Sequence, residues 1–234
     1  MKRTDYKKTT NRKKYRKRIF SISITLITAA VTVMIALRLY AQILGAPSLS
    51  VPKASLFLDQ NGHQIGDHFS QQRRYWIKLD DVSPFLADAF IATEDRQFYE
   101  HNGFDYSRIA GAVLKDVKTM SKAQGASSIT QQYARNLYLT HEKSWTRKIR
   151  EALFAYRLEV FYDKDTILEG YLNTVYFGHG MYGVEAASRF YFSKSANELT
   201  LEEAATIAAI AKGPSIYSPL DNPERSRDRQ LLVL

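Results

Sequence analysis

The first strong pattern along the chain is an uninterrupted apolar run near its amino end. The nineteen residues from Ile19 to Leu37 include no charged side chain. As a helix, this run would measure roughly 28 Å, close to the thickness of a bilayer's hydrocarbon core, about 30 Å. A cleaved signal peptide is the alternative, but its apolar region is usually only ~7–15 residues long, and residues 41–46 offer a weak cleavage-like stretch. The pattern therefore predicts one transmembrane anchor, at residues 19–39.

Beyond the anchor, the apolar positions predict a small β element followed by helices. Residues 55–58 and 64–65 flank Asn61-Gly62, which favours a β-hairpin because both turn positions tolerate a positive φ. From Ser83 onward, apolar residues recur at helical spacing. We expect helices at residues 83–94, 106–120, a stretch ending at 139, 144–162, 165–177, 200–213 and 225–234. The fold class is mostly α, and the expected divisions are a basic tail at 1–18, the anchor at 19–39, a stalk with the β element at 40–75 and a main domain at 76–234.

The charge of the chain is concentrated in the amino-terminal tail. Residues 1–18 contain ten Lys or Arg and one acid, so they account for the whole formal charge of +9. The remaining residues sum to zero, which argues against nucleic acid as a partner. Because cytoplasmic segments are enriched in Lys and Arg, we expect the tail in the cytoplasm and everything after Arg38 outside the membrane. The absence of cysteine excludes disulfides and thiolate metal sites.

One motif, at residues 178–183, matches the G-x-G-x-x-G pattern of dinucleotide sites. That pattern is meaningful only between a strand and a helix of a βαβ unit. The preceding residues are expected to be helical, so a glycine loop that lets the backbone approach a neighbour or a substrate is the better interpretation.

Several polar residues are candidates for chemistry, each with a structural alternative. Glu94 and Asp95 lie at the predicted carboxyl end of a helix, where the macrodipole disfavours negative charge by ~0.3–1 kcal/mol. An ordinary ion pair with Arg96 is the alternative to catalysis. Ser127 and Ser128 precede a predicted helix whose free N–H groups suit a phosphate, although simple N-capping explains them as well. Farther along, Arg147 and Glu151 have the spacing of a structural pair, worth at most ~0.5 kcal/mol.

The order and spacing of five motifs are more specific than any one of them. Together they resemble the glycosyltransferase family 51 domain, the peptidoglycan glycosyltransferase of class A penicillin-binding proteins and of monofunctional transglycosylases. The resemblance covers about half the chain. The motifs are Glu94-Asp95 with Phe98, His101 and Gly103; Gly125 with Ser127, Ile129, Thr130, Gln131 and Gln132; Arg147-Lys148 with Glu151; Ile167-Leu168-Glu169 with Tyr171-Leu172-Asn173; and Ala204 through Pro214, Tyr217 and Pro219. Departures are mild, with Ala126, Ser128 and Arg135 where the family often has glycine, threonine and lysine. Residues 211–214 are looser than the usual final motif.

The resemblance implies a lysozyme-like helical fold with two lobes around a cleft, and lipid II as the substrate. Glu94 would be the general base for the acceptor 4-hydroxyl, which attacks the anomeric carbon with inversion and forms a β-1,4 bond. Glu151 would be the second catalytic carboxylate, orienting cations or helping to hold Mg²⁺ or Mn²⁺ shared with the diphosphate; no dedicated metal site is expected. The diphosphate candidates are Arg96, Arg135, Lys143 and Arg150. The other substrate-binding residues implied are Asp95, Phe98, His101, Ser127, Thr130, Gln131, Gln132, Arg147, Lys148, Glu169 and Asn173.

Location and rival functions complete the expectations. A single-pass protein of a bacterial membrane, with its catalytic domain outside, would meet a lipid-linked substrate there, and other cell-wall synthesis or division proteins are possible partners. The apolar row Ile109, Val113 and Val117 suits either an interfacial helix or ordinary core packing. A lysozyme-like lytic enzyme and a non-catalytic membrane-anchored scaffold are the alternatives. The main domain at 76–234 contains no serine-x-x-lysine transpeptidase motif, so we expect a monofunctional enzyme or part of a class A penicillin-binding protein.

Overall fold

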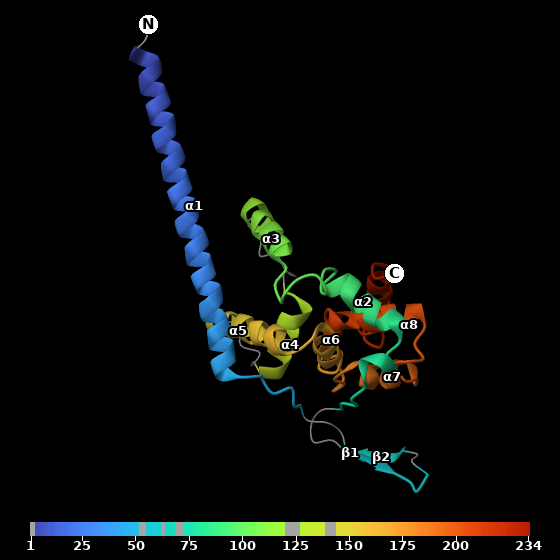
Figure 1. The fold of residues 1–234 in the computed structure, drawn as a ribbon. Coiled ribbons are helices and arrows are strands. Elements are labelled where there is room, and N and C mark those ends of the chain that lie inside the picture. The colour runs from blue at the N-terminus through green and yellow to red at the C-terminus, as the bar shows by residue number, and fades with distance from the viewer. Residues whose placement is uncertain (1–2, 52–54, 62–63, 69–72, 120–126, 139–143) are drawn as a thin grey trace. The chain divides into compact units, whose positions relative to one another are not determined.

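The computed structural model describes residues 3–51, 55–61, 64–68, 73–119, 127–138 and 144–234. These residues divide into two compact units, one ending at Ala46 and the other running from Pro47 to Leu234. Within the described residues, helices predominate, and a single two-stranded sheet is present (Figure 1). The predicted fold class, mostly α with a small β element and an amino-terminal apolar helix, is confirmed.

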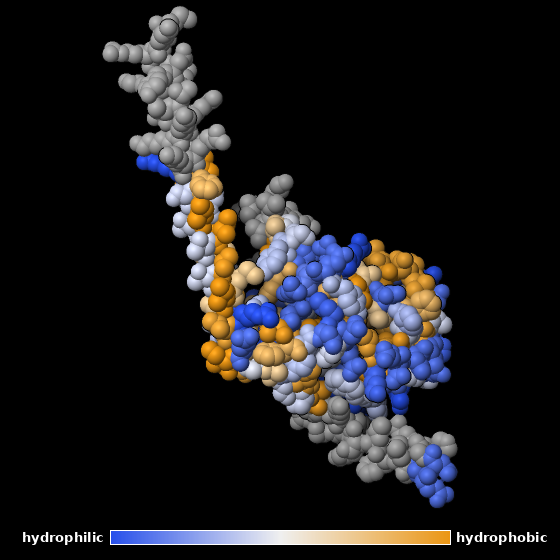
Figure 2. Space-filling model, in the orientation of Figure 1, coloured by the Kyte–Doolittle hydropathy of each residue, from blue (hydrophilic) through white to orange (hydrophobic). Residues whose placement is uncertain are grey.

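The first unit is one helix, α1 (Arg3–Leu44). Its segment Arg18–Leu44 is long and apolar enough to cross a membrane, and Figure 2 shows apolar side chains along it. The hydroxyls of Thr25, Thr28 and Thr32 donate to backbone carbonyls four residues earlier, at 2.9–3.0 Å. Such bonds satisfy polar groups within the helix, as a hydrocarbon environment requires. The helix continues five residues past the predicted end of the anchor at residue 39.

The second unit begins with the predicted hairpin. Strand β1 (Ser55–Leu58) pairs antiparallel with β2 (Gln64–His68), in the register Ser55↔His68 to Leu58↔Gln64, with an irregularity after Phe57. A 3₁₀ turn, η1 (Leu79–Asp81), then leads into α2 (Pro84–Glu94), which starts with proline at its first position. Ser83 precedes α2, but its hydroxyl donates to the carbonyl of Leu199 at 3.1 Å instead of capping the helix.

Most of the helices that follow overlap a predicted segment, whereas those at 184–192 and 214–217 were not predicted. They are α3 (Tyr106–Thr119), α4 (Ile129–Tyr138), α5 (Trp145–Phe161), α6 (Lys164–Leu172), α7 (Val184–Phe192), α8 (Leu201–Ala211), α9 (Pro214–Tyr217) and α10 (Pro223–Leu231). Helix α8 opens with a capping box, in which the side chains of Thr200 and Glu203 each accept a hydrogen bond from the other residue's backbone N–H. Residues 121–125, where we expect a loop after the predicted helix at 106–120, lie outside the described residues.

The helix predicted at 165–177 ends earlier, at Leu172, and this expectation was wrong. Asn173 ends it, because its side-chain amide donates to the carbonyls of Glu169 and Ile77, both at 2.8 Å. The chain then turns through residues 174–183. Gly183 has a φ of +83°, and a Cβ there would lie 2.9 Å from the carbonyl oxygen of Asn173. The glycine motif therefore allows a close backbone approach between two helices, and the alternative of a dinucleotide loop finds no βαβ unit around it.

The core of the second unit is built around α2, α4, α6 and α8. Helix α2 packs against α8, and α4 packs against α5 and α6. Phe90 of α2 is fully buried and meets the rings of Tyr171 and Phe177 edge to face, with centroids 5.8 and 6.2 Å apart. Burying such aromatic side chains dominates the stabilisation of a core. This packing fixes the carboxyl end of α2 next to the first turns of α4.

Candidate active site

Glu94 is the last residue of α2, and its carboxylate is almost buried, with 9% of the side chain exposed. Its Oε2 accepts a hydrogen bond of 2.9 Å from the amide of Gln132 on α4. The ammonium of Lys212, just after α8, lies 3.9 Å from Oε1, which is beyond hydrogen-bonding distance. Among the described residues, Oε1 therefore accepts no hydrogen bond and is open to a ligand.

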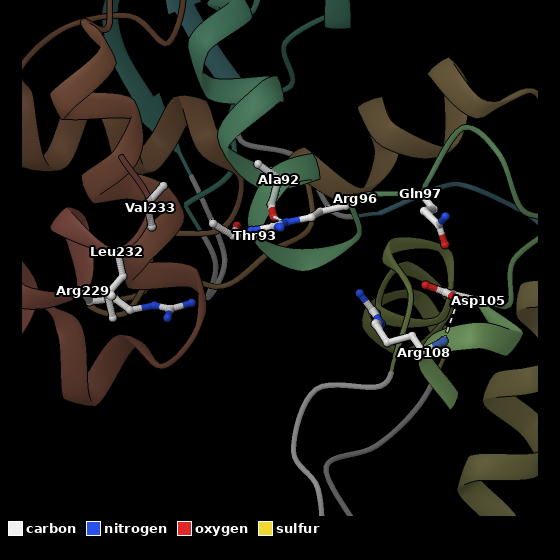
Figure 3. Close-up of a pocket in the computed structure, with 9 residues that line it drawn as sticks. All are labelled: Ala92, Thr93, Arg96, Gln97, Asp105, Arg108, Arg229, Leu232 and Val233. Carbon is white, nitrogen blue, oxygen red and sulfur yellow. Dashed lines mark hydrogen bonds between the residues drawn. The ribbon is translucent and has the colours of Figure 1, made fainter. Parts of the chain in front are cut away.

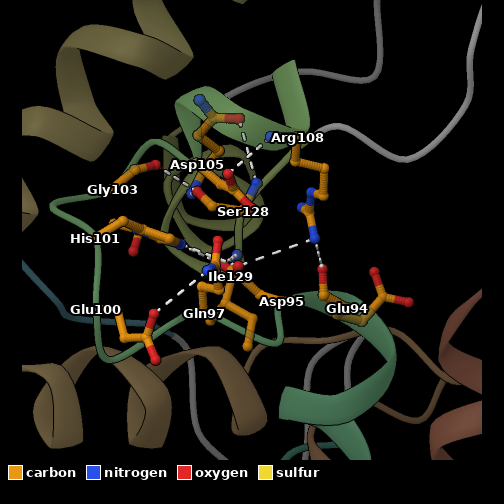
Figure 4. A network of polar contacts seen from close by, with 12 residues as sticks. Glu94, Asp95, Gln97, Glu100, His101, Gly103, Asp105, Arg108, Ser128 and Ile129 are labelled. Atoms are coloured by element: carbon orange, nitrogen blue, oxygen red, sulfur yellow. Dashed lines mark hydrogen bonds and ion pairs between the residues drawn. The ribbon is translucent and has the colours of Figure 1, made fainter. Parts of the chain in front are cut away.

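Asp95 connects the end of α2 to the start of α4 (Figure 4). Its carboxylate is fully buried and accepts from the backbone N–H of Ile129 at 3.0 Å. Both of its oxygens lie 3.0 Å from Nε2 of His101. Carboxylates near a helix amino end are favourable because the exposed N–H groups carry partial positive charge. Asp95 thus holds the two helices that carry Glu94 and Gln132 in contact.

The turn after Asp95 is anchored by the other residues of the first motif. Phe98 is fully buried and packs edge to face on Tyr99 and His101, with centroids 5.1 and 6.5 Å apart. Gly103 has a φ of +81°, which favours glycine, and its carbonyl accepts from the hydroxyl of Ser128 at 2.5 Å. Through these contacts Phe98, His101 and Gly103 hold the turn after Asp95 in place. Their contact with substrate stays a prediction.

The N–H groups of Ile129 and Gln131, in the first turn of α4, already donate hydrogen bonds to side chains of the protein. Ser128 caps the helix, since its Oγ accepts from the N–H of Gln131 at 3.2 Å. The N–H of Ile129 is bound to Asp95. The capping interpretation of this segment is therefore supported by the geometry, and the phosphate interpretation gains no support. Thr130 also faces inward, where its hydroxyl donates to Glu159 at 2.5 Å.

Gln132 is placed by a second contact, on the face of α4 toward α6. The hydroxyl of Tyr171, on α6, donates to its Oε1 at 3.4 Å. Burial of this tyrosine, and secondarily the charge of Glu94, raises the pKa of its hydroxyl well above the usual value. The hydroxyl consequently stays protonated and remains a donor to Gln132. The amide of Gln132 is thereby oriented with its NH₂ toward Glu94.

The second carboxylate, Glu151 on α5, is fully buried and paired with two cations. Its Oε2 accepts from Arg147 at 3.1 Å, and its Oε1 accepts from Lys148. Lys148 also donates to the hydroxyl of Ser127 at 2.8 Å. Ser144 caps α5 through the N–H of Arg147 at 3.1 Å, which sets the start of the helix and hence the positions of both cations. The Arg147–Glu151 pair that the spacing suggested is thus present, whereas an arrangement of the diphosphate candidates Arg96, Arg135, Lys143 and Arg150 by Glu151 stays a prediction.

Other predicted residues lie apart from this centre. Glu169 accepts from the indole of Trp76 at 2.9 Å and from the N–H of Leu79 at 3.0 Å, while Asn173 binds the backbone of Ile77. Both therefore hold the segment before α2 in place. Arg150 is exposed, Arg135 is half-buried on α4, and Lys143 lies outside the described residues. Their roles toward a diphosphate stay predictions, as does the interfacial role of residues 113–117, whose side chains also lie outside the description.

The structure adds residues that sequence reasoning missed. Lys212 lies within residues 211–214, the part of the last motif that departs most from the family pattern. The motif marks this segment, but the approach of Lys212 to Glu94 depends on how α8 packs on α2. Arg108, on α3, donates to the carbonyls of Glu94 and Ser127, both at 2.5 Å. Nothing in the local sequence marks this arginine, because its two acceptors come from distant segments.

A second feature, a cavity of about 640 Å³, lies beside the last turn of α2. Arg108, Arg96 and Arg229 contribute to its walls, and Figure 3 shows Arg108 and Arg229 extending toward one another. The lining residues are Ala92, Thr93, Arg96, Gln97, Asp105, Arg108, Arg229, Leu232 and Val233. Arg96 thus faces this cavity, which neither Arg147 nor Lys148 lines.

The described residues do not fit a dedicated divalent ion. No group of three or more potential ligands from His, Asp and Glu occurs in the part of the chain that the structure describes. At Glu151, both carboxylate oxygens already face cations. A metal there would have to displace Arg147 and Lys148, so these side chains do not form an oxygen cage of the kind that Mg²⁺ prefers.

Most of the chain is similar in sequence to known proteins. Residues 61–234 match the transglycosylase family. The chain is 52% identical to penicillin-binding protein 2D of Bacillus subtilis (strain 168) over 206 residues, which are 88% of this chain and 30% of that protein. It is 44% identical to penicillin-binding protein 1A of Aquifex aeolicus (strain VF5) over 187 residues, 80% of this chain and 26% of that protein. It is also 42% identical to penicillin-binding protein 1F of Bacillus subtilis (strain 168). That match extends over 181 residues, which are 77% of this chain and 25% of that protein. The chain therefore spans less than a third of the length of each of these relatives.

Proposed function

Because this chain belongs to the transglycosylase family, we propose that it is a peptidoglycan glycosyltransferase that polymerises lipid II into β-1,4-linked glycan strands. One observation about the site carries the proposal. Three buried carboxylates belong to the motifs, those of Glu94, Asp95 and Glu151, and among these three only Glu94 has an oxygen that accepts no hydrogen bond from a described residue. A general base needs such a free oxygen within reach of the proton it takes.

In the proposed reaction, Oε1 of Glu94 removes the proton from the 4-hydroxyl of the acceptor sugar. The hydroxyl oxygen then forms a bond to the anomeric carbon of the donor, with inversion. The bond from that carbon to the diphosphate breaks, and undecaprenyl diphosphate leaves with the electron pair. Gln132 holds the other carboxylate oxygen through its 2.9 Å bond, which fixes the direction of Oε1. A base positioned in this way is worth roughly 10²–10⁴ in rate.

The leaving diphosphate needs cations, and the group around Glu151 supplies two. Arg147 and Lys148 each make one ion pair with Glu151, and their remaining N–H groups are suited to phosphate oxygens. Glu151 is therefore proposed to orient these cations, with no direct part in proton transfer. Ser127 links this group to the acceptor side, because its hydroxyl binds Lys148 while its carbonyl binds Arg108.

A divalent ion would fit this site only as a partner of the substrate's own diphosphate. Bound to the phosphate oxygens, Mg²⁺ or Mn²⁺ would neutralise part of their charge. No step proposed above depends on it, because Lys212, Arg147 and Lys148 already place positive charge near Glu94 and Glu151.

The apolar helix α1 is consistent with a membrane anchor, and we propose the orientation that its basic tail favours. With residues 1–18 in the cytoplasm, residues 47–234 lie on the outer side of the membrane. A lipid-linked substrate presents its sugars at the outer leaflet, so anchor and substrate would meet on the same surface.

Product analysis tests the proposed function. The full chain in detergent is incubated with lipid II, and the products are separated by size; glycan strands longer than a disaccharide are expected. A parallel reaction with preformed glycan tests the lysozyme-like lytic alternative, which would release fragments. Fragments without polymer would contradict the proposal, and inactivity toward both substrates would favour the non-catalytic scaffold.

A further inference from the structure

Lys212 brings a positive charge to the open side of the Glu94 carboxylate. Its ammonium nitrogen lies 3.9 Å from Oε1, the oxygen that accepts no hydrogen bond from a described residue. This separation exceeds the roughly 2.7–3.2 Å of a hydrogen bond, so the two groups do not bind each other directly. A single oxygen atom between them would lie about 2.8 Å from each, within hydrogen-bonding distance of both.

The position of Lys212 is set by the end of α8. Lys212 ends this helix, where a positive charge is favourable because the last carbonyls carry partial negative charge. Helix α8 packs against α2, which carries Glu94, and its buried alanines at positions 204, 205, 208 and 209 add little bulk. Pro214 then begins α9, and a Cβ at Gly178 would lie only 3.3 Å from the Cβ of Pro214. The glycine loop therefore packs closely against the turn that follows Lys212.

The ammonium of Lys212 is available, whereas the other polar groups around Glu94 are engaged. Within the described residues, Lys212 donates no side-chain hydrogen bond, and 38% of its side chain is exposed. Gln132 is neutral and binds Oε2 of Glu94. Arg108 donates to the backbone carbonyls of Glu94 and Ser127, both at 2.5 Å. In the part of the chain that the structure describes, Lys212 is therefore the cation that faces the open oxygen.

We propose that Lys212 is a second catalytic residue, which donates a hydrogen bond to the acceptor's 4-hydroxyl oxygen while Glu94 takes the proton from that oxygen. This inference rests on the proposed function, because it concerns the hydroxyl that attacks the donor. The O–H bond breaks, its proton passes to Oε1 of Glu94, and the hydroxyl oxygen forms the bond to the anomeric carbon. The bond from that carbon to the diphosphate breaks, and the electron pair leaves with the diphosphate. Lys212 keeps its own proton throughout.

The contribution of Lys212 would come from the charge that develops during the reaction. Negative charge builds on the hydroxyl oxygen as its proton leaves, and a donor already aimed at that oxygen stabilises it. One such donor in a water-excluded site is worth roughly 10²–10³ in kcat, and we expect less here because the side chain of Lys212 is 38% exposed. The ground-state hydroxyl carries no net charge, so Lys212 should affect kcat much more than substrate binding.

The test compares three variants of the full chain in detergent, with lipid II as the substrate. Lys212→Met removes the charge and keeps a long side chain, whereas Lys212→Arg keeps the charge. Lys194→Met is the matched control, because the side chain of Lys194 is 41% exposed and pairs with Glu203, in the first turn of α8, at 2.7 Å. All rates are measured at a temperature where each variant is folded.

We expect Lys212→Met to lower kcat by roughly 10–100-fold, while the concentration of lipid II at half the maximal rate changes less than about twofold. Lys212→Arg should recover at least about a tenth of the wild-type kcat, since the charge is kept but its geometry differs. Lys194→Met should keep the wild-type kcat. The thermal midpoint of Lys212→Met should match that of the wild type within a few degrees, because an exposed pair 3.9 Å apart contributes little to stability.

Three results would overturn the inference. The first is a wild-type kcat in Lys212→Met. The second is a raised half-saturating concentration with an unchanged kcat, since Lys212 would then bind substrate without acting on the reaction. The third is an equal loss in Lys212→Arg and Lys212→Met. In these cases the wild type still polymerises lipid II and the proposed function stands, whereas a wild type that makes no polymer would overturn the proposed function and this inference together.

Discussion

The side-chain amide of Gln132 donates a 2.9 Å hydrogen bond to one oxygen of Glu94 and leaves the other oxygen open. The two residues lie 38 positions apart, and the contact exists because Asp95 ties the end of α2 to the first N–H of α4. Glu94 is thus held by a neutral donor, and the ammonium of Lys212 lies 3.9 Å from its open oxygen. This arrangement suits a residue that must accept a proton from a substrate.

Replacing Gln132 should therefore reduce activity with little change in stability. In Gln132→Met the size is kept and the amide is lost, so Glu94 becomes free to rotate away from the acceptor. We expect a fall in kcat of roughly tenfold, equivalent to the ~1–1.5 kcal/mol of one hydrogen bond. Asn136→Met, at an exposed position of the same helix, is the control and should keep normal activity. Equal rates for the two variants in a lipid II polymerisation assay would show that Gln132 does not position the base.

Glu151→Gln should weaken both the fold and the use of the donor. The buried carboxylate pairs with Arg147 and Lys148, and an amide in its place leaves these cations without a counter-charge. Loss of one partner of a buried ion pair costs up to ~3–5 kcal/mol, and less here because Lys148 is 44% exposed. We expect a lower thermal midpoint and at least a tenfold loss of polymerisation, measured at a temperature where the variant is folded. Normal activity in the folded variant would rule out a role for Glu151 in holding the donor.

Gly170 should tolerate no side chain. A Cβ at this position of α6 would lie 2.1 Å from the hydroxyl oxygen of Tyr133, whose ring is fully buried on α4. Gly170→Ala forces this packing apart and should destabilise the protein by roughly 1–3 kcal/mol. Gly111→Ala on α3 is the matched control, because a Cβ there meets no atom within 4 Å. That substitution should be neutral or stabilise by up to ~1 kcal/mol. Urea denaturation of both variants decides the point, and a Gly170→Ala protein as stable as the wild type would refute the predicted close approach.

Because Asp105 caps α3 with a charged carboxylate, we expect the free energy of unfolding to depend on pH. Hydrogen bonds from the N–H of Arg108 and then from the hydroxyl of Ser107 lower the pKa of this group below its usual value. A lowered pKa means that the charged form stabilises the fold at pH values above the unfolded pKa of about 3.9, and that this contribution is lost as the pH falls through the folded value. Asp105→Asn keeps a capping acceptor but has no charge to titrate.

The free energy of unfolding of the wild type should exceed that of Asp105→Asn by roughly 0.3–1 kcal/mol at neutral pH, because a charge at a helix amino end is favourable. This difference should stay constant down to about pH 5 and shrink below about pH 4. Urea denaturation at a series of pH values measures it. A difference that does not change between pH 7 and pH 3 would show that the carboxylate of Asp105 makes no charge-dependent contribution.

Local sequence rules predicted much of this fold because many of its helix boundaries depend on near neighbours. The capping box of Thr200 and Glu203 and the end of α2 at Glu94 are examples. The end of α6 could not be predicted in this way, since Asn173 ends the helix by binding Ile77, 96 positions away. The approach of Lys212 to Glu94 likewise depends on helices packing together, and no local pattern encodes it.

The sequence predicted only those site residues that belong to a recognisable motif. Glu94 and Glu151 were identified by their motifs, and the structure places both in buried positions with polar partners. The cavity with Arg108 and Arg229 carries no motif, because its arginines come from α3 and α10 and meet only in the folded chain. Asn173, which its motif predicted to bind substrate, binds the backbone of Ile77 in the structure, and its contact with substrate stays a prediction.

The most direct test of this account is polymerisation of lipid II by the Glu94→Gln variant. Glutamine keeps the size of the side chain, so the fold should remain intact, while the base is removed. We predict that glycan synthesis falls by roughly 10²–10⁴ relative to the wild type, with an unchanged thermal midpoint. Polymer formation at a rate within a few-fold of the wild type would contradict the assignment of Glu94 as the base.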